Sequence, residues 1–356
     1  MALQSLQIDD FRCIRKAELE LDPRLTLIAG SNGSGKSSLL EAMFLLGRGR
    51  SFRTARLETA VRVGAERFRV VGNVISGART LTIGVESDNG SLKVRLGGAP
   101  AESLGSLAVA FPVQVIDPGV HKLIEEGPVG RRRYLDWGVF HVEHSYLAQW
   151  QRLQRVLKQR NAALRTDADD ELLDAFDREL AWVGEDISAA RIRYAASLVP
   201  YIAGSCERLM GEQISVQYAK GWPEGIALEE ALALARERDR RRKASTVGPH
   251  RADLVLERLD GPARVTVSRG QQKLMAAAMV LGQLELHADQ QGLSATLLLD
   301  DPAAELDSAR LARLVDEVRR LPGQVVMTSL TPGAELLGKP GKTFHVEQGV
   351  ASPVKL

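Results

Sequence analysis

The sequence predicts an α/β fold built around a phosphate-binding loop, and three short segments carry that prediction. Residues 30–37 (GSNGSGKS) fit the pattern G-x-x-x-x-G-K-[ST] in full. Residues 297–301 are an apolar run that ends in Asp300 and Asp301, the usual position for carboxylates that hold Mg²⁺ beside such a loop. Residues 268–273 (SRGQQK) directly precede a predicted helix. Together these segments indicate a phosphate site whose parts come from both ends of the chain.

The elements around the loop alternate as such a core requires. Residues 25–29 are a short apolar strand that leads into the loop, and residues 38–46 are the helix that follows it. Strands are also predicted at 3–8, 17–21, 254–256, 265–267, 295–299, 324–327 and 342–347, and helices at 271–287 and 308–320. Apolar strands that alternate with helices predict a parallel core sheet with covering helices.

The middle of the chain has a different character. Residues 66–116 predict an antiparallel subdomain with a hairpin turn at Asp88-Asn89-Gly90. Helical patterns then take over, at 146–164, 172–201 and 227–243, without a sustained heptad repeat, so no long coiled coil is expected. We therefore expect a head formed by residues 1–125 and 246–356, with residues 126–245 inserted as a helical lobe.

Composition sets broad limits on this reading. The chain has 356 residues, with 47 Lys and Arg against 45 Asp and Glu, so any nucleic-acid partner requires the positive charge to be gathered in patches. Two cysteines, Cys13 and Cys206, do not make a disulfide framework. The first residues have no basic region followed by an apolar run, so we expect no signal peptide, and no apolar stretch is long enough to span a membrane. We expect a cytoplasmic protein.

The loop residues have distinct expected roles. Glycines at 30, 33 and 35 allow backbone conformations in which successive N–H groups point at phosphate oxygens, and the following helix adds its positive end. Lys36 is expected to contact the β- and γ-phosphates, and Ser37 to hold Mg²⁺ together with Asp300. The nucleotide-binding residues predicted here are Gly30, Ser31, Asn32, Gly33, Ser34, Gly35, Lys36, Ser37 and Ser38.

Two interpretations of the role of Asp301 remain open. It is the best candidate for orienting the attacking water, but it is also placed to cap the following helix. The segments resemble those of ABC ATPases, where a glutamate is common at this position, and aspartate is one methylene shorter. We therefore expect slow ATP hydrolysis.

The segment at 268–273 has the form of the ABC-ATPase signature. A serine at a helix start offers a second anion site. A single chain has no obvious use for two such sites, whereas a two-fold pair of chains uses both of them. We expect Ser268, Arg269, Gly270 and Gln271 to reach ATP on a second copy; the alternative is an ordinary helix cap. The resemblance also makes Gln114 a candidate for contacting Mg²⁺ and water, against the alternative of an ordinary strand residue.

Clusters of basic residues lie within the predicted helical lobe. Such clusters either neutralise the phosphates of DNA or form solvated helix faces. The DNA-binding candidates are Arg131, Arg132, Arg133, Arg152, Arg155, Arg240, Arg241, Arg242 and Lys243. A further polar turn at residues 248–253 contains His250 and Arg251, which either reach a ligand or fix the loop.

The whole set of motifs resembles the RecF family of bacterial recombination proteins. The motifs are residues 10–12 (DFR), 30–38, 131–136 (RRRYLD), 158–162 (KQRNA), 248–251 (GPHR), 267–274 (VSRGQQKL) and 298–301 (LLDD). The resemblance implies an ABC-type head like that of SMC proteins, a weak DNA-stimulated ATPase activity and ATP-dependent homodimerisation on DNA. It further implies action on single-stranded and duplex DNA at gaps or junctions, help in loading RecA, and RecO and RecR as partners. Arg12 is expected to contact a nucleotide phosphate or to pair with Asp9 or Asp10.

This chain departs from the family pattern at two places. Ala304 stands where the family usually has serine, and Thr328 and Ser329 stand where many ABC ATPases have a switch histidine. A hydroxyl cannot become positively charged as histidine does, so we do not assign γ-phosphate sensing to these residues. Two other functions remain as alternatives: a passive ATP-held DNA clamp with vestigial hydrolysis, and the ATPase subunit of a transporter.

Overall fold

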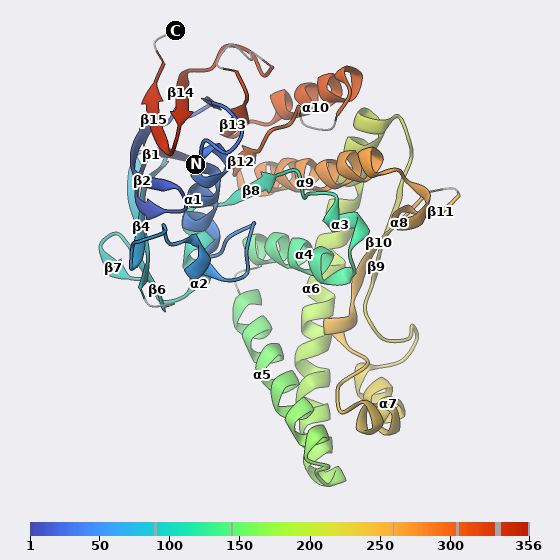
Figure 1. The fold of residues 1–356 in the computed structure, drawn as a ribbon. Helices are drawn as coiled ribbons and strands as arrows, with labels where there is room; N and C mark the ends of the chain where they lie inside the picture. The colour runs from blue at the N-terminus through green and yellow to red at the C-terminus, as the bar shows by residue number, and fades with distance from the viewer. Residues whose placement is uncertain (89–90, 144, 259, 304–305, 332–335, 355–356) are drawn as a thin grey trace. The chain divides into compact units, whose positions relative to one another are not determined.

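A computed structural model describes residues 1–88, 91–143, 145–258, 260–303, 306–331 and 336–354 (Figure 1). The chain forms two compact units. Unit 1 comprises residues 1–121, 208–210 and 273–356, and unit 2 comprises residues 122–207 and 211–272. The division predicted above differs from these units mainly at its second boundary, because residues 246–272 pack with the helical residues of unit 2.

Unit 1 contains a six-stranded, largely parallel sheet in the order β15-β14-β3-β13-β12-β8. Its strands are β3 (Leu25–Ala29), β8 (Val113–Ile116), β12 (Thr296–Leu299), β13 (Val325–Ser329), β14 (Lys342–Glu347) and the antiparallel edge strand β15 (Val350–Pro353). β12 and β13 are buried along their whole length, as expected for strands covered on both faces. The carboxyl ends of β3 and β12 lie at the same edge of this sheet, because both run parallel to β13.

Three helices of the head carry the predicted pattern. They are α1 (Lys36–Arg48), α9 (Arg269–Gln291) and α10 (Ser308–Arg320). α1 is almost entirely buried, and it packs in the core between the two sheets of unit 1. Asp307 is the N-cap of α10, and its side chain accepts a hydrogen bond from the Arg310 backbone N–H.

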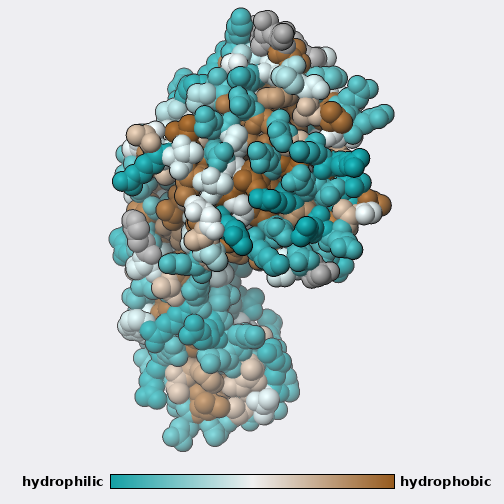
Figure 2. All heavy atoms as spheres, turned by 90° about the vertical axis from the view of Figure 1, so that its left-hand side faces the viewer, coloured by the Kyte–Doolittle hydropathy of each residue, from teal (hydrophilic) through white to brown (hydrophobic). Residues whose placement is uncertain are grey.

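A second six-stranded sheet of unit 1 is antiparallel, in the order β2-β1-β4-β5-β6-β7. Its strands are β1 (Ala2–Phe11), β2 (Ile14–Glu20), β4 (Arg67–Ser76), β5 (Arg79–Asp88), β6 (Ser91–Leu96) and β7 (Ala99–Pro100). Buried and exposed residues alternate along β4, and the buried ones join the core around α1. Figure 2 shows the side of the molecule on which this sheet lies, where mostly hydrophilic side chains face the solvent.

The predicted antiparallel region was too long at its carboxyl end. Helix α2 (Leu104–Ala110) follows β7, and Val113–Ile116 then joins the parallel sheet beside β12. The prediction failed here because a four-residue strand does not show from its own sequence whether its partner is parallel or antiparallel. Of the predicted hairpin turn, Asp88 pairs with Ser91, and residues 89 and 90 lie outside the described ranges.

Unit 2 is mainly helical. It contains α3 (Lys122–Glu125), α4 (Pro128–Val142), α5 (Tyr146–Arg165), most of α6 (Asp170–Met210), α7 (Leu228–Arg242) and α8 (Ala263–Thr266). A small antiparallel sheet joins β9 (Ser215–Ala219), β10 (Asp253–Arg258) and β11 (Gly261–Pro262).

The strand predicted at 265–267 is wrong, because α8 covers Ala263–Thr266. Its two valines and one threonine favour a strand by residue type. However, Val265 is 80% exposed, whereas Ala263 and Val267 are buried. Burial at positions four residues apart fits one helical turn better than a strand, so position in the fold outweighed residue type.

Among the described residues, no helix combines the length and the apolar character needed to cross a membrane.

Candidate nucleotide site

The phosphate loop connects β3 to α1 and has the backbone that its glycines predict. Gly30, Gly33 and Gly35 have φ angles of 157°, 76° and 116°. A Cβ at Gly30 would lie 2.3 Å from the Val346 carbonyl oxygen, so this position has no room for a side chain. The Lys36 ammonium group donates hydrogen bonds to the carbonyl oxygens of Gly30 (2.8 Å) and Ser31 (2.9 Å). The lysine therefore lies across the loop that would surround a phosphate.

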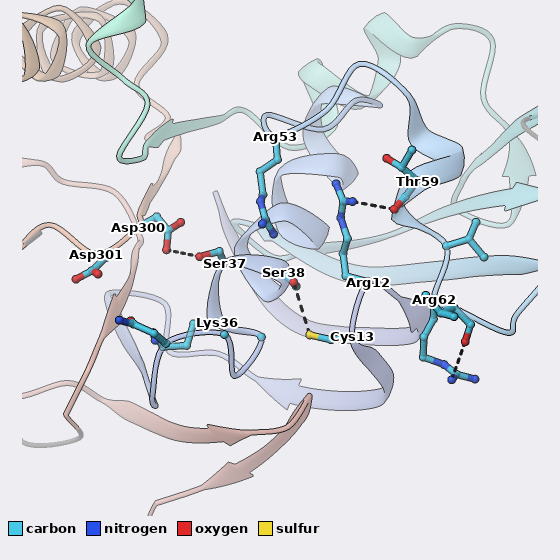
Figure 3. Close-up of a pocket in the computed structure, with 15 residues that line it drawn as sticks. Arg12, Cys13, Lys36, Ser37, Ser38, Arg53, Thr59, Arg62, Asp300 and Asp301 are labelled. Carbon is cyan, nitrogen blue, oxygen red and sulfur yellow. Dashed lines mark hydrogen bonds between the residues drawn. The ribbon is translucent and has the colours of Figure 1, made fainter.

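The two carboxylates follow β12 and face the start of α1. The Ser37 hydroxyl donates a hydrogen bond to Asp300 Oδ1 (3.0 Å), as Figure 3 shows. Thr328 at the end of β13 donates to the same oxygen (2.8 Å) and accepts a hydrogen bond from the backbone N–H of Asp301 (2.7 Å). The parallel sheet thus brings together residues from three distant parts of the chain.

Asp301 occupies an unusual environment. Its φ is 46°, a conformation that non-glycine residues seldom adopt and that often marks a functional position. Burial and the neighbouring Asp300 carboxylate raise the pKa of Asp301, and the charges of Lys36 and Lys273 partly oppose this effect. A cation near the two carboxylates would relieve their mutual repulsion.

A cavity of about 690 Å³ adjoins the loop and the carboxylates. Residues predicted from the sequence and residues missed by it both line the cavity. The predicted ones are Arg12, Asn32, Gly33, Gly35, Lys36, Ser37, Ser38, Asp300 and Asp301, and the missed ones are Cys13, Arg53, Thr59, Val61, Arg62 and Val63. Of the remaining loop residues, Ser34 has a buried hydroxyl group with no hydrogen-bond partner among the described residues.

Arg12 contacts neither of its expected acidic partners. It forms two hydrogen bonds with Glu41 of α1, from Nε to Oε2 (3.0 Å) and from Nη2 to Oε1 (2.6 Å). Asp10 instead accepts a hydrogen bond from Arg62 (2.6 Å). The interpretation of Arg12 as paired with Asp9 or Asp10 is therefore wrong, while its position in the cavity wall keeps it available to a phosphate.

The structure does not bring Gln114 to this cavity. The residue is inside β8, opposite Leu297 of β12 rather than beyond the strand end, and it is buried. Its Nε2 donates to Gln283 Oε1 of α9 (2.6 Å). This position matches the ordinary strand role that remained open for Gln114.

The signature segment begins α9 and belongs to unit 2. Ser268 and Gln271 form a reciprocal pair: the Ser268 backbone N–H donates to the Gln271 side chain (2.9 Å), and the Gln271 backbone N–H donates to the Ser268 hydroxyl (3.4 Å). This arrangement is a capping box. Arg269 and Gly270 follow Ser268 at the helix start, so the segment presents a helix amino terminus, as predicted.

The basic clusters separate into buried and exposed members. Arg131 makes two hydrogen bonds to Asp253 (2.7 and 2.9 Å), Arg132 donates to the Ala252 carbonyl, and burial lowers the pKa of Arg132. Arg152 pairs with Glu179, Arg240 with Asp170 and Lys243 with Asp167. Within the described ranges, Arg133, Arg155, Arg241 and Arg242 are exposed and form no ion pair. Arg152 and Lys243 are exposed as well, but they are engaged in ion pairs, so these four are the exposed candidates whose charge no described acidic side chain offsets.

The polar turn around His250 has an internal role. The His250 Nε2 and the Arg251 guanidinium both contact the Ser245 carbonyl oxygen, at 3.0 and 2.9 Å. Of the two interpretations that remained open for this turn, the contacts support the one in which these side chains fix the loop.

A phosphate loop between β3 and α1, carboxylates at the end of β12 and a signature helix define the ABC-type ATPase head, the class that includes the heads of SMC proteins.

Membership of a particular family follows from comparison with known proteins. The RecF/RecN/SMC N terminal domain model matches residues 2–350. The DNA replication and repair protein RecF of Erwinia tasmaniensis is 36% identical over 353 residues, which cover 98% of both chains. The RecF protein of Edwardsiella ictaluri is 37% identical over 355 residues, covering 98% of this chain and 99% of the relative. The chain therefore belongs to the RecF family.

Solved structures support the same assignment. A structure of the recombination mediator protein RecF with ATP in the RecFOR pathway superposes with a TM-score of 0.90 at 27% identity, covering 99% of this chain and 98% of that one. The Smc head domain from Pyrococcus furiosus superposes with a TM-score of 0.61 at 16% identity, covering 100% of this chain and 96% of that one. The second likeness shows the shared head fold. Family membership makes the transporter-subunit alternative wrong.

Proposed function

We propose that this protein is a slow ATPase that binds ATP between two copies of itself on DNA and acts in recombinational repair. The observation that carries the proposal is the meeting of Lys36, Ser37, Asp300 and Asp301 beside one cavity. A glycine loop with a lysine and a helix amino terminus suits a polyphosphate, and the RecF relatives with ATP support ATP as that ligand.

The residues present also fit a magnesium ion. Ser37 and Asp300 place a hydroxyl and a carboxylate oxygen 3.0 Å apart, and such hard oxygen donors are the ligands that Mg²⁺ prefers. Mg²⁺ would bind Ser37 and Asp300, with phosphate oxygens and water completing its shell. When bound, the ion would offset the negative charge of the phosphates.

Asp301 is the residue that we assign to orienting the attacking water. Its backbone N–H donates a hydrogen bond to the Thr328 hydroxyl, and this bond fixes the backbone position from which the Asp301 side chain extends beside the cavity. A carboxylate can accept a hydrogen bond from water and so direct the oxygen at the γ-phosphate. The side chain of aspartate is one methylene shorter than that of glutamate and reaches less far. We therefore expect slow hydrolysis that times release from DNA.

The signature helix supplies the second side of the nucleotide in this proposal. Ser268 and Gln271 satisfy each other at the start of α9. The Ser268 hydroxyl and the N–H groups of Gly270 and Gln271 would turn to the γ-phosphate bound by a second copy. A two-fold pair of chains makes two such sites.

DNA contacts are assigned to four exposed cations of unit 2 that form no ion pair within the described residues, Arg133, Arg155, Arg241 and Arg242. By the family relationship, we further propose that the protein acts at gaps or junctions between single-stranded and duplex DNA, works with RecO and RecR, and assists the loading of RecA. The same relationship supports a nucleoid-associated location and stimulation of the ATPase by DNA.

The shared site is tested by sedimentation with ATP, Mg²⁺ and DNA. The unaltered protein should pair, whereas Lys36→Arg and Ser268→Arg should each remain monomeric. An equal mixture of the two variants should recover part of the pairing, because one of its two sites joins the intact loop of one variant to the intact signature of the other. Ser145→Arg, at the N-cap of α5, is the matched control and should pair normally. An unaltered protein that remains a monomer would contradict the proposal.

The short side chain of Asp301 also favours a second candidate, the passive ATP-held clamp. In that case hydrolysis does not control release of the protein from DNA, and the Asp301→Asn variant should dissociate from DNA at the same rate as the unaltered protein. The ATPase proposal predicts slower release by Asp301→Asn. Release rates measured after dilution into competitor DNA distinguish the two functions.

A further inference from the structure

The phosphate-loop helix contains a fully buried carboxylate that none of the roles above uses. Glu41 lies in α1 and is 0% exposed. A buried carboxylate is stable only when other groups compensate its charge. Glu41 is surrounded by such groups: Arg12 donates twice to it, and the Ser51 hydroxyl and Arg53 donate to it from the segment after α1.

Both arginines bound by Glu41 also line the nucleotide cavity. Arg12 comes from the turn between β1 and β2, and Arg53 comes from the segment between α1 and β4. Figure 3 shows the two side chains next to each other above the start of α1, with Ser37 nearby. One carboxylate thus joins the phosphate-loop helix to two cations from separate segments.

The two arginines are held with different strength. Arg12 makes its two bonds to Glu41 and a third to the Thr59 carbonyl oxygen (2.8 Å), and its side chain is 19% exposed. Arg53 makes one long contact with Glu41 (3.5 Å), and its side chain is 46% exposed. Arg12 is therefore fixed, whereas Arg53 can move toward a ligand without breaking a strong bond.

We propose that Glu41 is a positioning residue for nucleotide binding, which fixes Arg12 and keeps the more mobile Arg53 near it at the wall of the phosphate cavity. Two guanidinium groups that share a cavity wall repel each other, and the Glu41 charge offsets one of them. The remaining positive charge faces the cavity, where it would attract the triphosphate. This inference rests on the proposed ATP site and adds how the chain arranges the cations of that site.

The proposal makes a prediction opposite to that of simple charge counting. Removing a negative charge near a polyphosphate should strengthen binding if only the overall field matters. If Glu41 positions the arginines, its removal should weaken binding instead. A purely structural role would lower stability and leave the affinity of the folded protein unchanged.

The test measures the affinity of Mg-ATP by calorimetry for Glu41→Gln, with circular dichroism to confirm folding. We expect the dissociation constant to rise about tenfold or more. The matched control is Asp10→Asn, which removes one charge from the half-exposed pair with Arg62 at the rim of the same cavity; asparagine tolerates the positive φ of that position. This control should bind Mg-ATP as tightly as the unaltered protein, or slightly more tightly.

A second variant covers the case in which Glu41→Gln does not fold. Arg12→Lys keeps the charge but cannot keep both bonds to Glu41, and we expect a comparable loss of affinity. Folded Glu41→Gln or Arg12→Lys protein that binds Mg-ATP with unaltered affinity would overturn the positioning role. Failure of the unaltered protein to bind Mg-ATP would instead contradict the proposed function itself.

Discussion

Thr328 and Asp300 are joined by a hydrogen bond of 2.8 Å from the threonine hydroxyl to the carboxylate Oδ1. The same hydroxyl accepts the backbone N–H of Asp301 at 2.7 Å. One β13 side chain therefore fixes the proposed metal ligand and the residue assigned to the attacking water. Thr328 and Ser329 together stand where many ABC ATPases have a switch histidine, and the two hydrogen bonds of Thr328 give its uncharged hydroxyl a supporting role for the acidic residues.

We predict that Thr328→Val lowers the ATP hydrolysis rate by about tenfold or more. Valine keeps the shape but loses both hydrogen bonds, and a bond to a charged group contributes about 1.5–3 kcal/mol. Thr328→Ser should retain most of the activity. The control is Thr343→Val, because the buried Thr343 hydroxyl has no hydrogen-bond partner among the described residues. Phosphate release at saturating ATP is the measurement, and equal rates for the two valine variants would contradict this role.

Unit 2 contains a buried arginine, Arg160, that we expect to stabilise it. Arg160 is 0% exposed and donates to Asp177, Asp239 (2.7 Å) and the Ser245 hydroxyl (2.8 Å). Arg160→Leu removes the positive charge that offsets the buried carboxylates of Asp177 and Asp239. Because breaking a buried ion pair costs about 3–5 kcal/mol, we predict a loss of that size in the free energy of unfolding.

The predicted loss is measured by urea unfolding followed by tryptophan fluorescence, because all four tryptophans of the chain belong to unit 2. Arg155→Leu is the control on the same helix α5. Its side chain is exposed, so this substitution should change stability by about 0.5 kcal/mol or less. Similar midpoints for the two variants would show that the buried network does not stabilise the unit.

The parts of the site that could be predicted are those whose signal is local. The loop at 30–37, its strand and its helix are contiguous, and the glycines need no distant partner to be recognised. Asp300 was also predictable, because an apolar strand that ends in acids is a local pattern. Helix Ser308–Arg320 and strand Lys342–Glu347 have the predicted bounds for the same reason.

The parts that were missed depend on pairing between distant segments. Glu41 reads as one polar residue in an apolar helix, and nothing nearby in the sequence shows that it binds Arg12 and Arg53. Gln114 was misplaced for a related reason: whether a strand residue faces a site depends on its distance from the strand end, and β8 continues past it to Ile116. Ala304, where the family pattern has serine, lies outside the described residues.

Binding to DNA should depend on the exposed arginines and little on the buried ones. We predict that Arg155, Arg241 and Arg242, replaced together by alanine, weaken ATP-dependent DNA binding. Each arginine that contacts a phosphate contributes about 0.9 to the slope of log affinity against log salt. The slope of the triple variant should therefore be shallower than that of the unaltered protein.

The control for this experiment removes the same number of charges from the antiparallel sheet. Arg69, Arg79 and Arg95 are exposed there, and their replacement by alanine should leave the salt slope unchanged. DNA affinities are measured by fluorescence anisotropy at several salt concentrations. Equal slopes for the two triple variants would place the DNA contact elsewhere.

The stability of unit 2 should fall in mild acid because of His250. Burial and nearby arginines lower the pKa of His250 to about 4, although the Ser245 carbonyl partly opposes this shift; an unfolded histidine has a pKa of about 6.5. Between these values the unfolded chain binds a proton that the folded protein does not, so stability decreases as the pH falls. From pH 7 to pH 5 this effect amounts to about 2 kcal/mol.

His250→Gln should lose less stability over that interval than the unaltered protein, in urea unfolding followed by tryptophan fluorescence. His345→Gln, at an exposed position of β14 in unit 1, should behave as the unaltered protein does. An identical pH dependence for His250→Gln and the unaltered protein would mean that His250 does not cause the loss.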